Sequence, residues 1–183
     1  MRLLVGLAIS VPLGVGAGLA AGLNRRVAGF FSPFFSIIAA TPVMSVILIA
    51  YLAFGAEKTP VFTSFLMIFP VMAANTIEGI RAIEPKMDEL FKVYALTKIQ
   101  RLRFLYLPSL LPFLAGGLRS GLSLGWKVVI AAEVLVQPLS ALGTGMQQAK
   151  AHLETPELFA WTAAAVAASA FSEFVLAFIL RKI

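Results

Sequence analysis

The chain has 183 residues, of which 60% are hydrophobic and 13% charged, and its formal net charge is +6. Soluble domains are about 45–50% apolar and about 25% charged, so this composition excludes an ordinary soluble enzyme and predicts a single membrane domain over residues 1–183. The sequence has no cysteine and one histidine, which excludes disulfides and leaves few ligands for a metal centre. The positive charge is typical of a membrane protein with basic cytoplasmic loops, so we expect no nucleic-acid partner.

Apolar segments of about 20 residues, enough to cross a bilayer core of about 30 Å, recur along the chain. Val27–Ala56 is too long for one perpendicular helix, and Pro33 and Pro42 favour a short interfacial segment before its span. The segment from Phe104 is long and contains prolines, so a kinked span is expected there. The sequence therefore predicts an all-α protein with about five spans, at about 3–24, 38–56, 59–79, 108–136 and 158–180.

A basic stretch between the third and fourth predicted spans sets the orientation. Its six basic side chains place it in the cytoplasm, because Lys and Arg gather in cytoplasmic loops; they are Arg81, Lys86, Lys92, Lys98, Arg101 and Arg103. Alternation of the spans then puts the C-terminus in the cytoplasm and Met1 outside. No segment of this sequence would carry Met1 outside, so we expect that a first span is absent.

Glycines recur every four residues in the first and fourth predicted spans, at positions 14, 18 and 22 and again at 117, 121 and 125. Small residues at this spacing let helix backbones approach closely. The pattern predicts tight packing within the chain, with a dimer face as the alternative.

Charged residues in the predicted spans are costly in lipid, so they are candidate functional residues. Arg119, Lys127 and Glu133 lie in the fourth span and Glu173 in the fifth. The structural alternative is that the long side chains of the fourth span reach the membrane interfaces. Trp126 fits an interfacial aromatic position or a place on a solute path.

The cytoplasmic stretch predicts a helix–turn–helix. Pro85 and the acids that follow it are typical of a helix start. Thr97 and Gln100 form a capping box that opens a second helix running into Leu107–Pro108. The first helix has an apolar stripe at i, i+3, i+4 and i+7, formed by Met87, Leu90, Phe91 and Tyr94. Such a helix docks on a soluble partner or lies on lipid.

This loop resembles the cytoplasmic loop of ABC-importer permeases, whose pattern is E-A-A, three residues, G, nine residues and I-x-L-P. Glu89, Leu107 and Pro108 match it, Leu90 and Phe91 replace the two alanines, and Ala95 replaces the glycine. The rest of the chain is similar to permeases of the nitrate, sulfonate and taurine group. The similar positions include Thr41-Pro42, Phe54-Gly55, Pro70, Asn75-Thr76, Gly79, Pro112, Gly117-Leu118-Arg119, Trp126, Glu133 and Gly143-Thr144-Gly145.

The resemblance implies a type I ABC-importer permease fold without the usual first helix, in the cytoplasmic (inner) membrane of a prokaryote. Residues 81–107 would then be the coupling loop, which contacts an ATPase subunit through Met87, Asp88, Glu89, Leu90, Phe91, Lys92, Tyr94, Ala95, Leu107 and Pro108. Candidate residues of the translocation path are Arg119, Trp126, Lys127 and Glu133, and the two cations would suit an anion such as nitrate, a sulfonate or taurine.

The implied partners are ABC ATPase subunits, which bind ATP and Mg, a second permease copy in a homodimer, and an extracytoplasmic substrate-binding protein. The chain itself would be a transport subunit in the lipid bilayer, with no catalytic residue, cofactor or metal. Two other functional classes are alternatives to the importer permease. The first is a secondary transporter or channel subunit with its own ion coupling, which Glu133 and Glu173 favour. The second is a scaffold whose loop lies on lipid.

Overall fold

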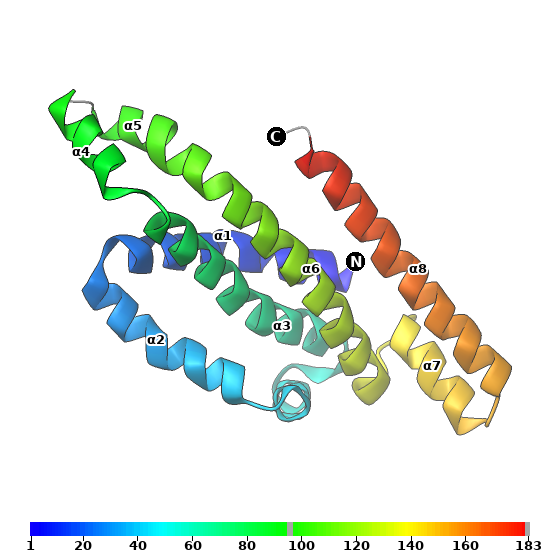
Figure 1. Ribbon diagram of the computed structural model, residues 1–183. Coiled ribbons are helices and arrows are strands. Elements are labelled where there is room, and N and C mark those ends of the chain that lie inside the picture. Colours follow the sequence, from blue (N-terminus) through cyan, green and yellow to red (C-terminus); the bar gives the residue numbers. More distant parts are fainter. Residues whose placement is uncertain (95–96, 182–183) are drawn as a thin grey trace.

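The computed structural model describes residues 1–94 and 97–181. Every regular element in these ranges is a helix, which confirms the predicted all-α class (Figure 1). In chain order they are α1 (Arg2–Leu23), α2 (Arg25–Ala40), α3 (Val43–Arg81), α4 (Pro85–Val93), α5 (Lys98–Arg101), the π-helix η1 (Leu102–Tyr106), α6 (Leu107–Val136), α7 (Leu142–Ala151) and α8 (Thr155–Leu180).

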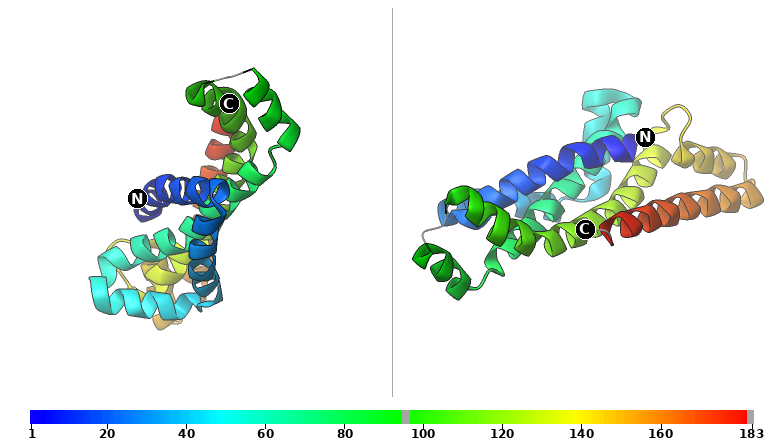
Figure 2. Two further views of the ribbon diagram at one scale, coloured as in Figure 1. Left: turned by 90° about the vertical axis from the view of Figure 1, so that its left-hand side faces the viewer. Right: turned by 90° about the horizontal axis from the view of Figure 1, so that it is seen from above.

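Helices α1, α3 and α6 form the centre of an elongated bundle, with α3 packed against both of the others. Helix α2 returns along one side, and α8 lies beside α6 (Figures 1 and 2). Helices α4 and α5 lie at one end of the bundle, called here the α4 end. Helix α7 lies at the other, the α7 end, and contacts α6 and α8. The central apolar cluster joins Leu3, Ile68, Met72, Leu122 and Val129.

The regularly spaced glycines lie where the central helices meet. A Cβ atom at Gly14 would lie 2.6 Å from Met72 Cβ, and one at Gly18 would lie 2.5 Å from Thr76 Cβ. On α6, a Cβ at Gly125 would approach Ile68 to 2.9 Å. The glycines therefore let α1 and α6 reach α3 closely, which confirms the prediction of tight packing within the chain.

Hydroxyl groups buried between these helices bond to backbone carbonyls. Ser10 Oγ donates to the carbonyl oxygens of Gly6 at 2.7 Å and of Phe65 in α3 at 3.1 Å. Thr76 Oγ1 donates to Met72 O at 2.8 Å. Because a buried polar group without a partner is costly, these bonds make small polar residues compatible with the apolar core.

The predicted short segment before Pro42 is confirmed, whereas the bounds of about 38–56 start the second span too early. Helix α2 ends at Ala40, and α3 begins at Val43, because Thr41 is extended and Pro42 has no amide hydrogen to continue the helix. Helix α3 then kinks at Gly55, whose φ of 74° lies in the left-handed region that favours glycine. Residues 43–54 therefore form a short helix before the helix over residues 56–81. Pro33 lies inside α2 and does not interrupt it.

Among the described residues, three helices are long and apolar enough to cross a membrane: α1, α3 and α8. Helix α2 has only 16 residues, and α6, with 30 residues, carries the charges discussed above. The structure therefore supports a helical membrane protein, while the predicted number of five spans stays a prediction. The stretch between the predicted spans 108–136 and 158–180 contains α7.

Candidate functional site

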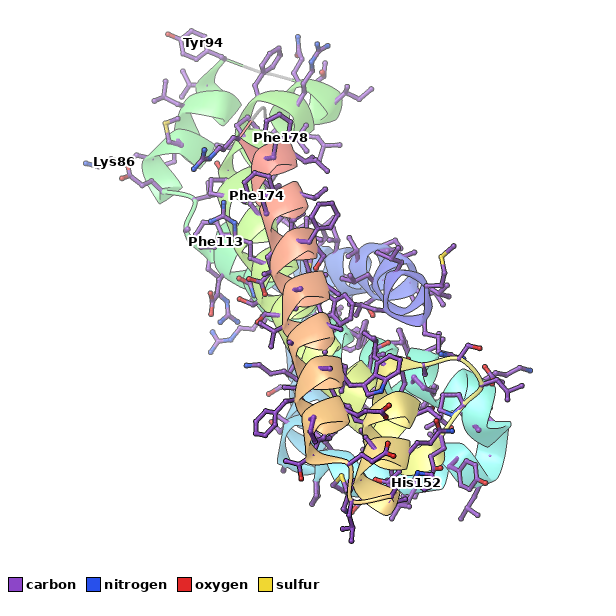
Figure 3. All side chains as sticks on the ribbon, turned by 90° about the vertical axis from the view of Figure 1, so that its right-hand side faces the viewer. Lys86, Tyr94, Phe113, His152, Phe174 and Phe178 are labelled. Carbon is purple, nitrogen blue, oxygen red and sulfur yellow. The ribbon has the colours of Figure 1, made fainter. Side chains whose placement is uncertain are left out.

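Helix α4 projects from the bundle with apolar side chains exposed. Met87 is 45% exposed, Leu90 47% and Tyr94, directly after the helix, 71%. Figure 3 shows Lys86 and Tyr94 pointing away from the bundle. Glu89 is exposed on the same helix. An amphipathic helix that buries little of its apolar stripe within its own chain has a surface available for a partner or for lipid.

The helix predicted at this position is confirmed, and it begins at Pro85 as the proline and acidic signals indicate. Asp88, Phe91 and Lys92 lie on α4, but their side chains lie outside the described part of the structure. Ala95, predicted to stand in the glycine position of the loop pattern, also lies outside the described residues.

The second helix of this region runs without a break into α6. The predicted capping box is confirmed: Thr97 N donates to Gln100 Oε1 at 2.9 Å, and Gln100 N donates to Thr97 Oγ1 at 3.4 Å. A π-turn follows, in which Leu107 N donates to Leu102 O. Pro108 in the first turn of α6 has no amide hydrogen, so the change of hydrogen-bond spacing falls directly before the proline. Displacement of α5 would therefore be passed along a continuous helix to α6.

A charged cluster joins three helices at the α7 end. Arg2 of α1 contacts Glu57 Oε2 at 2.6 Å and Glu133 Oε1 at 3.3 Å. It also donates to Leu139 O at 2.9 Å, and Leu139 N donates to Glu57 Oε1 at 2.7 Å. The side chain of Glu133 is only 8% exposed, against 55% for Glu57. Glu133 thus fixes α6 to α1 as a buried partner of a cation, an arrangement that supports packing.

The Gly-Thr-Gly sequence shapes the contacts of α7. Gly143 N donates to Glu133 Oε2 at 3.2 Å, and a Cβ at Gly143 would lie 2.5 Å from Val134 N. A Cβ at Gly145 would overlap the ring of Trp161 on α8. Thr144 Oγ1 donates to Pro138 O at 2.7 Å. The two glycines therefore let α7 pack tightly between α6 and α8, which gives this sequence a structural role.

The four candidate path residues do not share one cavity. Arg119 and Lys127 are exposed on α6, whereas Glu133 is buried in the charged cluster. Trp126 is half-buried, and its Nε1 donates to Ser172 Oγ of α8 at 2.7 Å. The structure brings Trp126 and Lys127 to one cavity and Trp126 and Glu133 to another. Whether these residues line a solute path stays a prediction.

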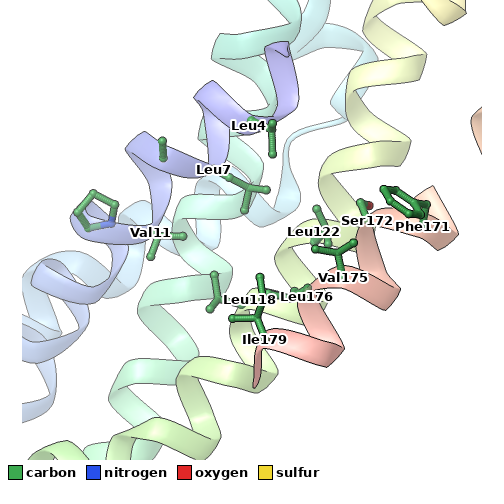
Figure 4. A pocket seen from close by; sticks show the side chains of 12 residues that line it. Leu4, Leu7, Val11, Leu118, Leu122, Phe171, Ser172, Val175, Leu176 and Ile179 are labelled. Atoms are coloured by element: carbon green, nitrogen blue, oxygen red, sulfur yellow. The ribbon is translucent and has the colours of Figure 1, made fainter. Parts of the chain in front are cut away.

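The cavities beside α6 differ in chemistry. One, of about 600 Å³, is an apolar groove between α1, α6 and α8, lined by residues such as Leu7, Leu118 and Val175 (Figure 4). The cavity of about 480 Å³ at the α7 end contains Arg2 and Glu133. A third, of about 470 Å³ between α6, α7 and α8, contains a lysine and a glutamate and is called here the α6–α8 cavity.

Arg2 and Glu57 were not among the predicted site residues, whereas Glu173 was predicted as a candidate functional charge of the fifth span but not as a path residue. Arg2 and Glu133 are 131 positions apart, and the only sequence signal for their pairing is opposite charge within apolar segments. Among the described residues, no group of three or more His, Cys, Asp or Glu side chains could hold a metal ion.

Comparison with known proteins gives a match over nearly the whole chain. The family described as "binding-protein-dependent transport system inner membrane component" matches residues 10–183. The matched residues include those of α4, the π-turn and α6 with its glycines.

The chain is also similar to individual proteins, and each alignment covers only part of the relative's length. The chain is 28% identical over 144 residues to the bicarbonate transport system permease protein CmpB of Synechococcus elongatus, covering 78% of this chain and 51% of the relative. It is 28% identical over 183 residues to the taurine transport system permease protein TauC of Escherichia coli, covering 100% and 65%. The nitrate import permease protein NrtB of Synechocystis sp. is 26% identical over 136 residues, covering 74% and 50%. The chain therefore spans about half to two thirds of the length of these relatives.

Proposed function

Because the chain belongs to the family of binding-protein-dependent transport system inner membrane components, we propose that it is a permease subunit of an ATP-driven importer. In this role it forms part of a path for a small solute that a substrate-binding protein delivers, and ATP hydrolysis resides in a partner chain. The family match over residues 10–183 is the observation that carries the proposal. Glu133 and the glycines of α6 and α7 support packing between the helices.

Helix α4 is the proposed contact with the ATPase subunit. It is an isolated helix at the end of the bundle, and it exposes Met87, Leu90 and Tyr94. A groove on a soluble partner would bury these side chains, as grooves do for other amphipathic helices. Glu89 and the basic side chains around it would set the orientation by charge. Movement of the partner then reaches α6 through α5 and the π-turn.

The remaining partners follow from the same proposal. A second permease copy would complete the path as a homodimer, and the substrate-binding protein would dock at the α7 end, opposite α4. The basic residues near α4 favour a cytoplasmic position for this end, together with the C-terminus, in the inner membrane of a prokaryote. The relatives are named for bicarbonate, taurine and nitrate, so we infer a small solute with an anionic group.

The test is a charge reversal on α4. In the assembled importer, Glu89→Lys should reduce solute uptake while the permease remains in the membrane, because the exposed carboxylate no longer pairs with the ATPase surface. Glu157→Lys, on α8 at the opposite end, is the matched control for assembly, because it should leave recovery of the ATPase subunit with the permease unchanged. Unchanged uptake by the Glu89→Lys variant would contradict the coupling role of α4.

A further inference from the structure

The α6–α8 cavity contains one positive and one negative side chain on facing helices. It has a volume of about 470 Å³, within the range of about 300–1,000 Å³ found for small-molecule sites. Its charged members are Lys127 of α6 and Glu173 of α8, and most of the other lining residues are apolar, among them Trp126, Ile130, Met146 and Val166.

A hydrogen bond between the two helices fixes these charges opposite the same space. Trp126 Nε1 donates to Ser172 Oγ at 2.7 Å, and Ser172 Oγ donates to Ser169 O at 2.8 Å. Lys127 directly follows Trp126 in α6, Glu173 directly follows Ser172 in α8, and both charged residues line the cavity. The Trp126–Ser172 bond therefore sets the register of α6 against α8 and, with it, the placement of the two charges.

Neither charge is neutralised within the described part of the chain. The ion pairs there involve Arg2, Glu57 and Glu133, and Lys127 and Glu173 are exposed to the cavity without a hydrogen-bonding side-chain partner among the described residues. Charges in membrane-spanning helices are costly unless water, protein or a ligand compensates them. A structural ion pair would need direct contact, which these two residues do not make in this structure.

We propose that the α6–α8 cavity binds a small zwitterion. Its anionic group would lie at Lys127 Nζ, its cationic group at the Glu173 carboxylate, and its short carbon chain against Trp126 and Ile130. A simple anion would satisfy Lys127 but would be repelled by Glu173, so the pair of charges selects a ligand that carries both signs. The inference rests on the proposed function and narrows its substrate class from small solutes with an anionic group to those that also carry a cationic group.

The test compares matched ligands on the purified permease–ATPase complex in lipid nanodiscs. Radiolabelled β-alanine and taurine are the zwitterionic probes. Propionate and ethanesulfonate are the corresponding anions without the ammonium group, so the two pairs separate carboxylate from sulfonate recognition. We expect the complex to bind at least one zwitterion about tenfold or more tightly than its matched anion, as one charge-assisted interaction provides.

Substitution of the two charged residues should have different effects on anion binding. Lys127→Met should weaken binding of the zwitterion and of the anion. Glu173→Gln should weaken zwitterion binding about tenfold and leave anion binding equal or stronger, because a repulsive charge is removed. Lys150→Met on α7 and Glu157→Gln on α8 are matched controls outside the cavity and should change neither.

Several outcomes would overturn the proposal. They are equal affinity of the unmodified complex for both members of each pair, no binding of any probe, and a parallel loss of both ligand types in Glu173→Gln, which would indicate a structural role. The same preparation separates the two levels of inference. An assembled, ATP-hydrolysing complex without zwitterion selectivity contradicts only this proposal, whereas absence of an ATPase subunit contradicts the proposed function.

Discussion

The contact between α1 and α3 provides a sharp test of the packing, because two glycines two positions apart on α1 have opposite surroundings. A Cβ at Gly14 would lie 2.6 Å from Met72 Cβ and 2.9 Å from Phe69 O, whereas a Cβ at Gly16 would meet nothing within 4 Å. Ordinary van der Waals contact begins at 3.4 Å, so the closest approach at Gly14 falls short by about 0.8 Å. Backbone atoms on α3 restrict the adjustment that could relieve this overlap.

We therefore expect Gly14→Ala to lower the free energy of unfolding by about 1–3 kcal/mol relative to Gly16→Ala, as overpacking does in other cores. Both substitutions replace glycine by a better helix former, a gain of about 0.8–1.0 kcal/mol in soluble helices, so the difference between the variants isolates the packing cost. The assay is reversible denaturation of the purified protein in mixed micelles. A Gly14→Ala variant at least as stable as Gly16→Ala would refute the close approach of α1 to α3.

Further predictions concern α6 to α8. Trp126→Phe and Ser172→Ala should show a coupling free energy of about 0.6 kcal/mol, up to about 1.7, in a double-mutant cycle of unfolding, and additive effects would contradict the hydrogen bond. Gly143→Ala should destabilise the protein by about 1–3 kcal/mol and more than Gly145→Ala, because the first Cβ meets backbone and the second a side chain; the reverse order in thermal unfolding would argue against this packing of α7. Arg119→Leu should lower solute uptake severalfold with normal assembly if its exposed side chain faces the path, and normal uptake kinetics would assign it a structural role.

Local signals predicted the helices best where capping residues or regularly spaced glycines mark them. Thr97 and Gln100 specify a helix start within four residues, and Pro85 with the following acids specifies another. Both predicted helix starts are confirmed. The glycine repeats were equally informative, since an absent side chain marks where a neighbouring backbone approaches.

Uniformly apolar sequence gave less guidance. Hydropathy is continuous between residues 27 and 56, and it was Pro42 that indicated the break at Thr41–Pro42. The second and third predicted spans meet between residues 56 and 59, close to the kink at Gly55, but the φ of 74° at this glycine has no signature in the local pattern.

Long-range charge placement was the least predictable part of the candidate site. Glu133 was expected as a path residue from its position in an apolar span, yet the structure places it against Arg2, which is distant in the sequence. Lys127 and Glu173 come from helices whose register is set by the Trp126–Ser172 hydrogen bond. Such pairings depend on tertiary packing, which local periodicity does not encode.

The most direct test of the account is affinity purification of the tagged chain in mild detergent, followed by mass spectrometry of the proteins that accompany it. The account predicts an ABC ATPase subunit in about equal amount, lost in Leu90→Asp on the exposed face of α4 and retained in Glu157→Lys at the opposite end of the bundle. Purification of the chain without an ATPase, or equal recovery of the ATPase with Leu90→Asp, would contradict coupling through α4.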